Sequence, residues 1–373
     1  MNARIMSKLF ALIMAAATFG LGCQNKSDGF SLLSESNVFR QSTAYTARPI
    51  DVLWVVDNSG SMATSQTNLA NNFRSFIQQF QAKGYDFRMA VGTTDAYLRL
   101  HYNQDSRARF KDGSGSQRTG IYIMDKNTPS LSDVFTRNVR VGTSGSGDER
   151  AFESLKQLLV NPLNMDFRRE DAYLSIIIVS DEEDMSHYDW FNGNSSYVFT
   201  DSPTHPSLFN PSTNPIHPTL NPQHGLHLPE MFKSFLDSFT KSSSSNKNYL
   251  VNSIIIKDEA CRAQLGQNSQ KLAPRVQALT EMTGGTAFSL CQPFDQILDA
   301  IQQQVIRAAA ATFQLIRTPI VSSITVRIDG QILRQDPVTG WIYDAATNSI
   351  VFADPPPAGA IISIDFDPEG VKI

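Results

Sequence analysis

The sequence predicts an α/β fold, in which a doubly wound, mostly parallel sheet is joined to a small antiparallel β-sandwich-like unit. From residue 51 onward, apolar runs of strand length alternate with amphipathic helical segments, an order that is typical of parallel sheets. The runs are apolar at successive positions, as in strands that helices cover on both faces. Beyond about residue 312 the hydrophobic period becomes two, which predicts antiparallel strands with one buried face.

The α/β domain is expected to span residues 50–311. Ligands of such folds bind at the carboxyl ends of the strands, so the residues that follow each strand are the candidates for a site. The expected strands are residues 51–57, 87–93, 172–180, 249–256 and 286–290, and the expected helices include residues 69–80, 152–159, 231–239, 272–282 and 297–305.

Two insertions interrupt this order. Residues 97–140 contain the turn signal Asp112-Gly113-Ser114-Gly115, which predicts a hairpin. Residues 187–229 hold five of the 6 His and seven of the 18 Pro, so we expect a long irregular surface loop there. Because this loop follows the most hydrophobic strand, it is expected to overhang the site and to contribute to partner specificity.

The C-terminal residues 312–373 form the predicted small β domain. Apolar residues alternate within 324–328 and within 362–366, and turn signals separate the alternating runs. Residues 30–48 are expected to add an edge strand to this unit.

Composition excludes several classes of protein. With 373 residues, of which 41% are hydrophobic, the chain has ample material for a large core, which excludes a wholly disordered protein. A net charge of -4 without a basic cluster argues against a nucleic-acid partner. No apolar run reaches the roughly 18 residues of a membrane-spanning helix, so membrane attachment is expected through a lipid anchor only.

The N-terminal residues 1–22 are typical of a signal peptide, with Arg4 and Lys8 before an uncharged apolar stretch. The segment FGLGC at residues 19–23 resembles a bacterial lipobox, which implies lipidation of Cys23 and a tether over residues 23–49. Gly20 departs from the Leu that the motif prefers, and ordinary cleavage after residues 15–17 is the alternative. Gln24 rather than Asp after the cysteine resembles lipoproteins of the outer membrane.

Two further cysteines, Cys261 and Cys291, remain if Cys23 carries lipid. Both lie near the ends of predicted strands in the same domain, and an exported protein favours their pairing. Two free buried thiols are the alternative.

The motif that indicates chemistry is DNSGS at residues 57–61, directly after the first predicted strand. Asp57, Ser59 and Ser61 present three oxygen atoms to one point, and hard cations such as Mg²⁺ take oxygen ligands. Asp181 stands at the carboxyl end of the strongest strand, and the Gly-rich loop 142–147 can add a hydroxyl. Asp and Ser are also common in turns and helix caps, which is the alternative interpretation.

The chain resembles the von Willebrand factor A-type (vWA) domain with a metal-ion-dependent adhesion site (MIDAS). The matching segments are DVLWVVDNSGSM at 51–62, GTSGSGDE at 142–149, SIIIVSDEED at 175–184 and MTGGTAFSLC at 282–291. The resemblance implies metal ligands at Asp57, Ser59, Ser61 and Asp181, with a loop hydroxyl expected from Thr143. The further candidates at or beside the ion are Ser144, Ser146, Glu149 and Glu182.

The resemblance also implies ligand binding rather than catalysis. A divalent cation, with Mg²⁺ expected and Ca²⁺ or Mn²⁺ as alternatives, would keep one coordination position for an Asp or Glu carboxylate of a partner protein. Where many members of the family have T-D-G, this chain has Ser180-Asp181-Glu182. We expect Glu182, Glu183 and Asp184 to be solvated or to lie beside the ligands. The whole chain resembles envelope lipoproteins of delta-proteobacteria, including predatory ones, which implies an outer-membrane adhesin facing the periplasm or the exterior.

Three alternatives stay open. The sequence lacks the HExxH, G-x-S-x-G, P-loop and G-x-G-x-x-G motifs, so metal-assisted hydrolysis at Asp57 and Asp181 is the most credible enzymatic function. A zinc site is conceivable at His217, His224 and His227, although no cysteine anchors it. The third alternative is a structural envelope scaffold that the metal only stabilises.

Overall fold

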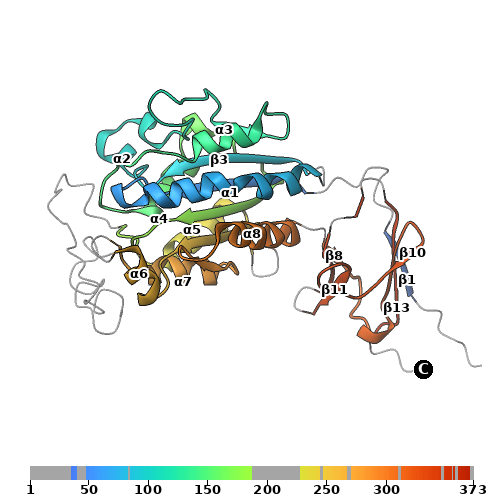
Figure 1. Ribbon diagram of the computed structural model, residues 1–373. Coiled ribbons are helices and arrows are strands. Elements are labelled where there is room, and N and C mark those ends of the chain that lie inside the picture. The colour runs from blue at the N-terminus through green and yellow to red at the C-terminus, as the bar shows by residue number, and fades with distance from the viewer. Residues whose placement is uncertain are drawn as a thin grey trace, which may run out of the picture.

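The computed structural model describes residues 35–39, 48–82, 85–186, 227–243, 247–266, 270–309, 312–345, 348–354, 356–357 and 360–369. Its main body is a six-stranded sheet of order β4-β3-β2-β5-β6-β7 (Figure 1). All neighbouring strands are parallel except β3 and β4, so the predicted α/β class is confirmed. The strands are β2 (Ile50–Val56), β3 (Phe87–Thr93), β4 (Ile123–Asp125), β5 (Tyr173–Val179), β6 (Tyr249–Ile255) and β7 (Ala287–Ser289).

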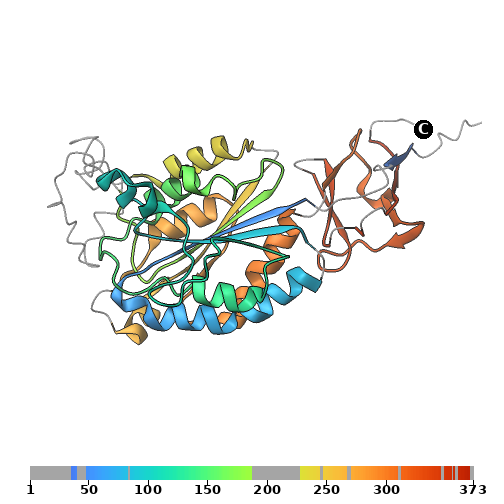
Figure 2. The same ribbon diagram turned by 90° about the horizontal axis from the view of Figure 1, so that it is seen from above.

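Helices cover both faces of this sheet (Figure 2). One face packs against α1 (Ala63–Ala82), α3 (Leu131–Asn138) and α8 (Phe294–Ala309), and the other against α4 (Ala151–Leu159), α5 (Pro229–Phe239) and α7 (Pro274–Met282). The short helix α6 (Glu259–Leu265) follows β6.

The alternation of side chains in β2 explains its unbroken apolar sequence. Val52, Trp54 and Val56 enter the core beneath α1 and α8, whereas Leu53 and Val55 enter the core beneath α4 and α5. Each is fully buried, and such burial contributes about 1.5–3 kcal/mol for a side chain of this size. The one polar residue of β2, Asp51, is at its start and is paired with Arg169, and the five residues that follow it are all apolar because both faces of the strand are buried.

The register of the parallel strands determines where the polar residues meet. Val56, the last residue of β2, is paired with Val179 of β5 and with Thr93 of β3. The residues that follow these three strands therefore lie at one edge of the sheet.

The insertion at residues 97–140 differs from its prediction. It folds as α2 (Leu98–Tyr102), the 3-10 turn η2 (Asp105–Ala108), β4 and α3. A turn is present, in which the Gln117 N–H donates to Ser114 O, but no strand flanks it among the described residues, so the predicted hairpin is wrong. Instead β4 pairs antiparallel with β3 and forms the edge strand on that side of the sheet.

Several predictions lie outside the described residues. These are the signal peptide, Cys23 and most of the tether, and residues 187–226 of the second insertion with four of its histidines. His227 is described and is buried, and its N–H donates to Ser186 O over 2.8 Å. Within the part of the chain that the structure covers, no helix has the length and apolar character needed to cross a membrane.

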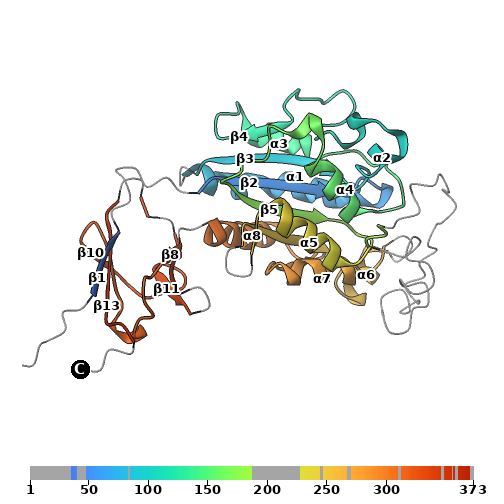
Figure 3. The same cartoon turned by 180° about the vertical axis from the view of Figure 1, so that it is seen from behind.

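The C-terminal unit consists of two small antiparallel sheets, β1-β13-β9-β10 and β11-β12-β8 (Figure 3). The two sheets enclose one apolar core that includes Val326, Trp341 and Ile362, so the predicted antiparallel unit is confirmed. β1 forms an edge strand that pairs with β13. The strands are β1 (Glu35–Phe39), β8 (Thr312–Gln314), β9 (Thr325–Ile328), β10 (Gln331–Leu333), β11 (Trp341–Asp344), β12 (Ser349–Phe352) and β13 (Ile362–Phe366).

Cys261 and Cys291 form a disulfide with a Cα–Cα distance of 5.6 Å, which confirms the expected pairing. It joins α6, which follows β6, to the turn that follows β7. The bridge thus fixes the two connections at one edge of the sheet.

Candidate metal centre

Asp57 is the first residue after β2 and is completely buried. Its N–H donates to Val179 O of β5 over 2.9 Å, which continues the strand pairing by one step. Its carboxylate accepts two hydrogen bonds, from the Ser59 N–H at 2.7 Å and from the Ser180 hydroxyl at 2.7 Å. The side chain is therefore held in one orientation by both strands.

The two serines of the DNSGS motif connect Asp57 to Asp181. The hydroxyl oxygens of Ser59 and Ser61 lie 3.1 Å apart, and the Ser61 hydroxyl donates to Asp181 Oδ1 over 3.0 Å. The turn that carries them, η1 (Gly60–Met62), leads directly into α1. Four of the five predicted metal ligands thus belong to one group that is joined by hydrogen bonds.

The Gly-rich loop packs directly on this motif. The Gly145 N–H donates to Asn58 O over 2.8 Å, and a Cβ atom at Gly145 would lie 2.4 Å from Asn58 Nδ2. Gln66 joins the loop to the strand end, because its Nε2 donates both to Asp57 O at 2.9 Å and to Gly142 O at 2.8 Å. Glycine at position 145 is therefore what allows the loop to lie against the motif.

The loop hydroxyls are placed differently from one another. Thr143 and Ser144 are exposed. The Ser146 hydroxyl is used inside the loop, where it accepts from the Asp148 N–H at 3.0 Å and from the Tyr97 hydroxyl at 3.3 Å. Thr143 remains the predicted hydroxyl ligand, and the fold holds its loop beside Gly60, since a Cβ atom there would lie 3.9 Å from Thr143 O.

Two further acidic residues, Glu149 and Glu182, lie at the same edge of the sheet and are buried. Lys271 Nζ approaches Glu182 Oε2 to 3.8 Å. Among the described residues neither carboxylate oxygen of Glu149 has a hydrogen-bond partner. Asp57 and Thr94 lie close enough to influence the pKa of Glu149, but no hydrogen bond of normal geometry joins them to it.

Burial raises the pKa of each of these carboxyls. It raises the pKa of Asp181 to about 6, with the charge of Asp57 as the second cause. It raises the pKa of Glu182 to about 8, against the opposing effect of Lys271. The pKa of Glu149 is raised well above its ordinary value by burial and then by the charge of Asp57, and burial also raises the pKa of Asp57.

The donor set fits a hard divalent cation. Carboxylate and hydroxyl oxygens are the ligands that Mg²⁺ and Ca²⁺ take. A cation would also supply the positive charge that a group of buried carboxylates otherwise lacks. No cluster of three or more His, Cys, Asp or Glu side chains suited to a metal occurs among the described residues, so a site here depends on the serine hydroxyls.

Glu183 and Asp184 are fully buried, so the first of the two roles expected for them, a solvated one, is wrong. The Arg275 N–H donates to Glu183 Oε2 over 2.9 Å, and Arg275 Nη2 donates to Asp184 Oδ2 over 3.2 Å. Asp184 also accepts from the Phe152 N–H at the start of α4 over 2.9 Å. The acidic run after β5 therefore anchors α4 and α7 to the sheet.

Sequence reasoning missed three residues that shape the centre. Ser180 orients Asp57, and Gln66 joins the strand end to the loop. Asp95 accepts a hydrogen bond from Asn58 Nδ2 over 2.9 Å. Asp95 follows β3 by two residues, so the rule that ligands bind at strand carboxyl ends could have found it. Gln66 has no such signal, since it occupies an ordinary helix position.

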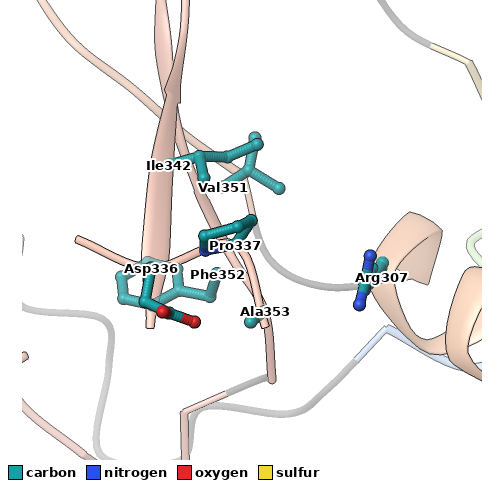
Figure 4. A pocket seen from close by; sticks show the side chains of 7 residues that line it. All are labelled: Arg307, Asp336, Pro337, Ile342, Val351, Phe352 and Ala353. Atoms are coloured by element: carbon teal, nitrogen blue, oxygen red, sulfur yellow. The ribbon is translucent and has the colours of Figure 1, made fainter. Parts of the chain in front are cut away.

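A cavity with an empty volume of about 380 Å³ lies elsewhere, between the last turn of α8 and the C-terminal unit (Figure 4). It is lined by Ile342 of β11, by Val351 and Phe352 of β12, and by Pro337, Ala353, Arg307 and Asp336. It shares no residue with the oxygen cluster and is separate from the candidate metal centre.

No protein-family model and no curated protein matches the sequence. Solved structures with some similarity include proximal thread matrix protein 1 from the mussel byssus, at 10% identity and a TM-score of 0.33, covering 74% of this chain and 51% of that one. A form of that protein has a zinc-occupied MIDAS motif. The ArnB paralog VWA2 from Sulfolobus acidocaldarius gives 8% identity and a TM-score of 0.32, with 90% of this chain and 59% of that chain covered.

The pilus adhesin SpaC from Lactobacillus rhamnosus GG gives 12% identity and a TM-score of 0.37, with 86% of this chain and 39% of that chain covered. The matches therefore span only 39% to 59% of the lengths of these three structures. With TM-scores below 0.5, these similarities establish neither a common fold nor a common function.

Proposed function

We propose that this protein is a metal-ion-dependent binding protein of the vWA type, with a MIDAS-like centre at the carboxyl ends of β2 and β5. The observation that carries the proposal is that hydrogen bonds join Asp57, Ser59, Ser61 and Asp181 into one group. These residues come from two segments about 120 positions apart, so their convergence is a product of the fold rather than of local turn chemistry.

The chemistry of the group favours binding over catalysis. Two carboxylates and two hydroxyls leave coordination positions of a divalent cation to be filled by water or by another molecule. An Asp or Glu side chain of a partner protein would complete the coordination and be attracted by the ion. We propose Mg²⁺ as the native ion, with Ca²⁺ or Mn²⁺ as alternatives, and we propose no catalytic residue.

We further propose that the protein is exported and anchored in the outer membrane by lipid on Cys23. The disulfide between Cys261 and Cys291 supports export, because such bonds persist in oxidising compartments. The centre lies at the opposite end of the strands from Pro49, which precedes β2. A tether that joins the chain at that end would leave the metal centre directed away from the membrane.

Calorimetric titration of the purified protein with MgCl₂ and MnCl₂ tests this function. The wild type should bind one ion, and the Asp57→Ala/Ser59→Ala variant should bind none while keeping its circular dichroism spectrum. Acetate added to the Mn²⁺-loaded wild type should then shift the ion's electron paramagnetic resonance signal, since a free carboxylate can occupy the open position. No ion binding by a folded wild type would refute the proposal.

A further inference from the structure

The least satisfied polar group at the centre is the carboxyl of Glu149. Glu149 is 2% exposed, and neither of its carboxylate oxygens has a hydrogen-bond partner among the described residues. Buried polar groups in folded proteins nearly always have a partner, and a buried charge without one is costly. A group left in this condition indicates that something absent from the protein itself belongs there.

The backbone holds Glu149 in this place. Glu149 O accepts a hydrogen bond from the Met185 N–H over 2.7 Å, which ties the end of the Gly-rich loop to the segment after β5. The guanidinium of the next residue, Arg150, binds Asp148 Oδ2 and lies 4.7 Å from the Tyr97 ring centroid. No ion pair among the described residues includes Glu149, Asp57 or Asp181.

Asp57 lies close enough to Glu149 for its charge to raise the pKa of Glu149. Two buried carboxyls that lie close together without a cation repel each other whenever both are ionised. A divalent cation between them would turn this repulsion into attraction and would give the Glu149 oxygens the partner that they lack.

We propose that Glu149 is a direct ligand of the metal ion and occupies the position that the resemblance assigns to the Thr143 hydroxyl. This inference rests on the proposed function, because it names a further ligand of the same centre. Thr143 is exposed, whereas Glu149 is buried and, within the described part of the chain, neither of its carboxylate oxygens has a hydrogen-bond partner. The ion is then bound by two carboxylates, Asp57 and Glu149, and by the two serine hydroxyls, with Asp181 held against Ser61.

The charge of the centre changes accordingly. Asp57 and Asp181 contribute the same charge in either case, so a glutamate in place of the threonine adds one negative charge to the centre. The protein therefore holds its ion more firmly before a partner arrives, and it attracts a partner carboxylate less strongly than a threonine-containing centre would. Glu149 favours ion retention at the expense of partner affinity.

The test is calorimetric titration of the full-length Glu149→Gln variant with MnCl₂. Glutamine preserves the shape of the side chain and removes its charge. The dissociation constant for Mn²⁺ should rise at least tenfold, whereas Thr143→Ala should stay within twofold of the wild type. The midpoint of thermal unfolding in EDTA should be equal or higher in Glu149→Gln, because the repulsion with Asp57 is gone. A merely structural role would instead lower this midpoint.

Each outcome separates this inference from the proposed function. If the wild type binds Mn²⁺ and Glu149→Gln binds it equally well, Glu149 is not a ligand, although the metal centre stands. The same conclusion follows if Thr143→Ala is the variant that loses affinity. If the folded wild type binds no Mn²⁺, both proposals are overturned. Glu149→Asp, which retains the charge on a shorter side chain, should bind Mn²⁺ more tightly than Glu149→Gln.

Discussion

The hydroxyl of Ser61 donates a 3.0 Å hydrogen bond to Asp181, a residue 120 positions later in the chain. This bond joins the turn after β2 to the end of β5 and brings the two halves of the metal centre together. Hydrogen bonds to charged groups are worth about 1.5–3 kcal/mol when buried, and less when partly exposed.

Replacing Ser61 by Ala removes both a proposed ligand and this link. We expect the affinity for Mg²⁺ to fall about tenfold and the free energy of unfolding in EDTA to fall by about 1 kcal/mol. Calorimetry and urea denaturation measure the two effects. Thr64→Ala is the control, since Thr64 is exposed in the following turn. Unchanged ion affinity in Ser61→Ala would remove this residue from the centre.

A methyl group at Gly145 should disturb the centre without touching any proposed ligand. It would approach Asn58 Nδ2 to 2.4 Å and Asn58 O to 2.7 Å, so the loop must move away from the motif. We expect Gly145→Ala to cost about 1–3 kcal/mol of stability and to weaken Mg²⁺ binding. Gly147→Ala is the matched control, because a Cβ atom there meets nothing within 4 Å. Equal behaviour of the two variants in calorimetry would show that the loop does not need its close approach.

The metal-free protein should lose stability as the pH rises from about 4 to about 8. The pKa of Asp181 is raised to about 6 and that of Glu182 to about 8 in the folded state. A carboxyl with a raised pKa binds its proton more tightly when folded, so its stabilising effect is complete below the unfolded pKa and disappears above the folded one.

Thermal unfolding in EDTA across this pH range measures the effect, and Glu182→Gln should reduce the slope. Saturating MgCl₂ should restore stability most strongly at the upper end of the range, where the carboxylates are ionised. Stability in EDTA that rises with pH over the same interval would contradict the raised pKa values.

The buried Arg275 should be essential for folding stability. It is the cationic partner of Asp184 and donates its backbone N–H to Glu183, and both acids are fully buried. Breaking a buried pair by removing one partner costs about 3–5 kcal/mol, and we expect Arg275→Met to fall in this range by urea denaturation. Lys271→Met, which removes a less buried cation 3.8 Å from Glu182, should cost less than about 1 kcal/mol. If Arg275→Met lowers the free energy of unfolding by less than about 1 kcal/mol, other groups must stabilise the buried Glu183 and Asp184.

Much of the fold follows from local patterns in the sequence. The apolar runs of β2 and β5 identify strands that are buried on both faces, and the first acidic residue after each run is a member of the centre. Asp57 and Asp181 could be chosen for this reason alone, and Ser59 and Ser61 by their spacing from Asp57. The change to a period of two likewise identifies the small C-terminal sheets.

The burial of charged residues could not be deduced in this way. Glu149, Glu183 and Asp184 occur in runs that look like solvated surface, and their burial depends on partners such as Arg275, which is 91 residues from Asp184. Sequence spacing carries no information about such long-range pairs. The insertion before α4 also differs from its prediction, because its glycines form a turn without strands on either side.

Anomalous diffraction from crystals soaked in MnCl₂ tests the central claim most directly. We expect one strong peak at the carboxyl ends of β2 and β5, within about 2.0–2.6 Å of oxygen atoms from Asp57, Ser59 and Ser61, with a Glu149 oxygen at a similar distance. The absence of a peak there under saturating Mn²⁺, or a peak only elsewhere in the molecule, would contradict the account.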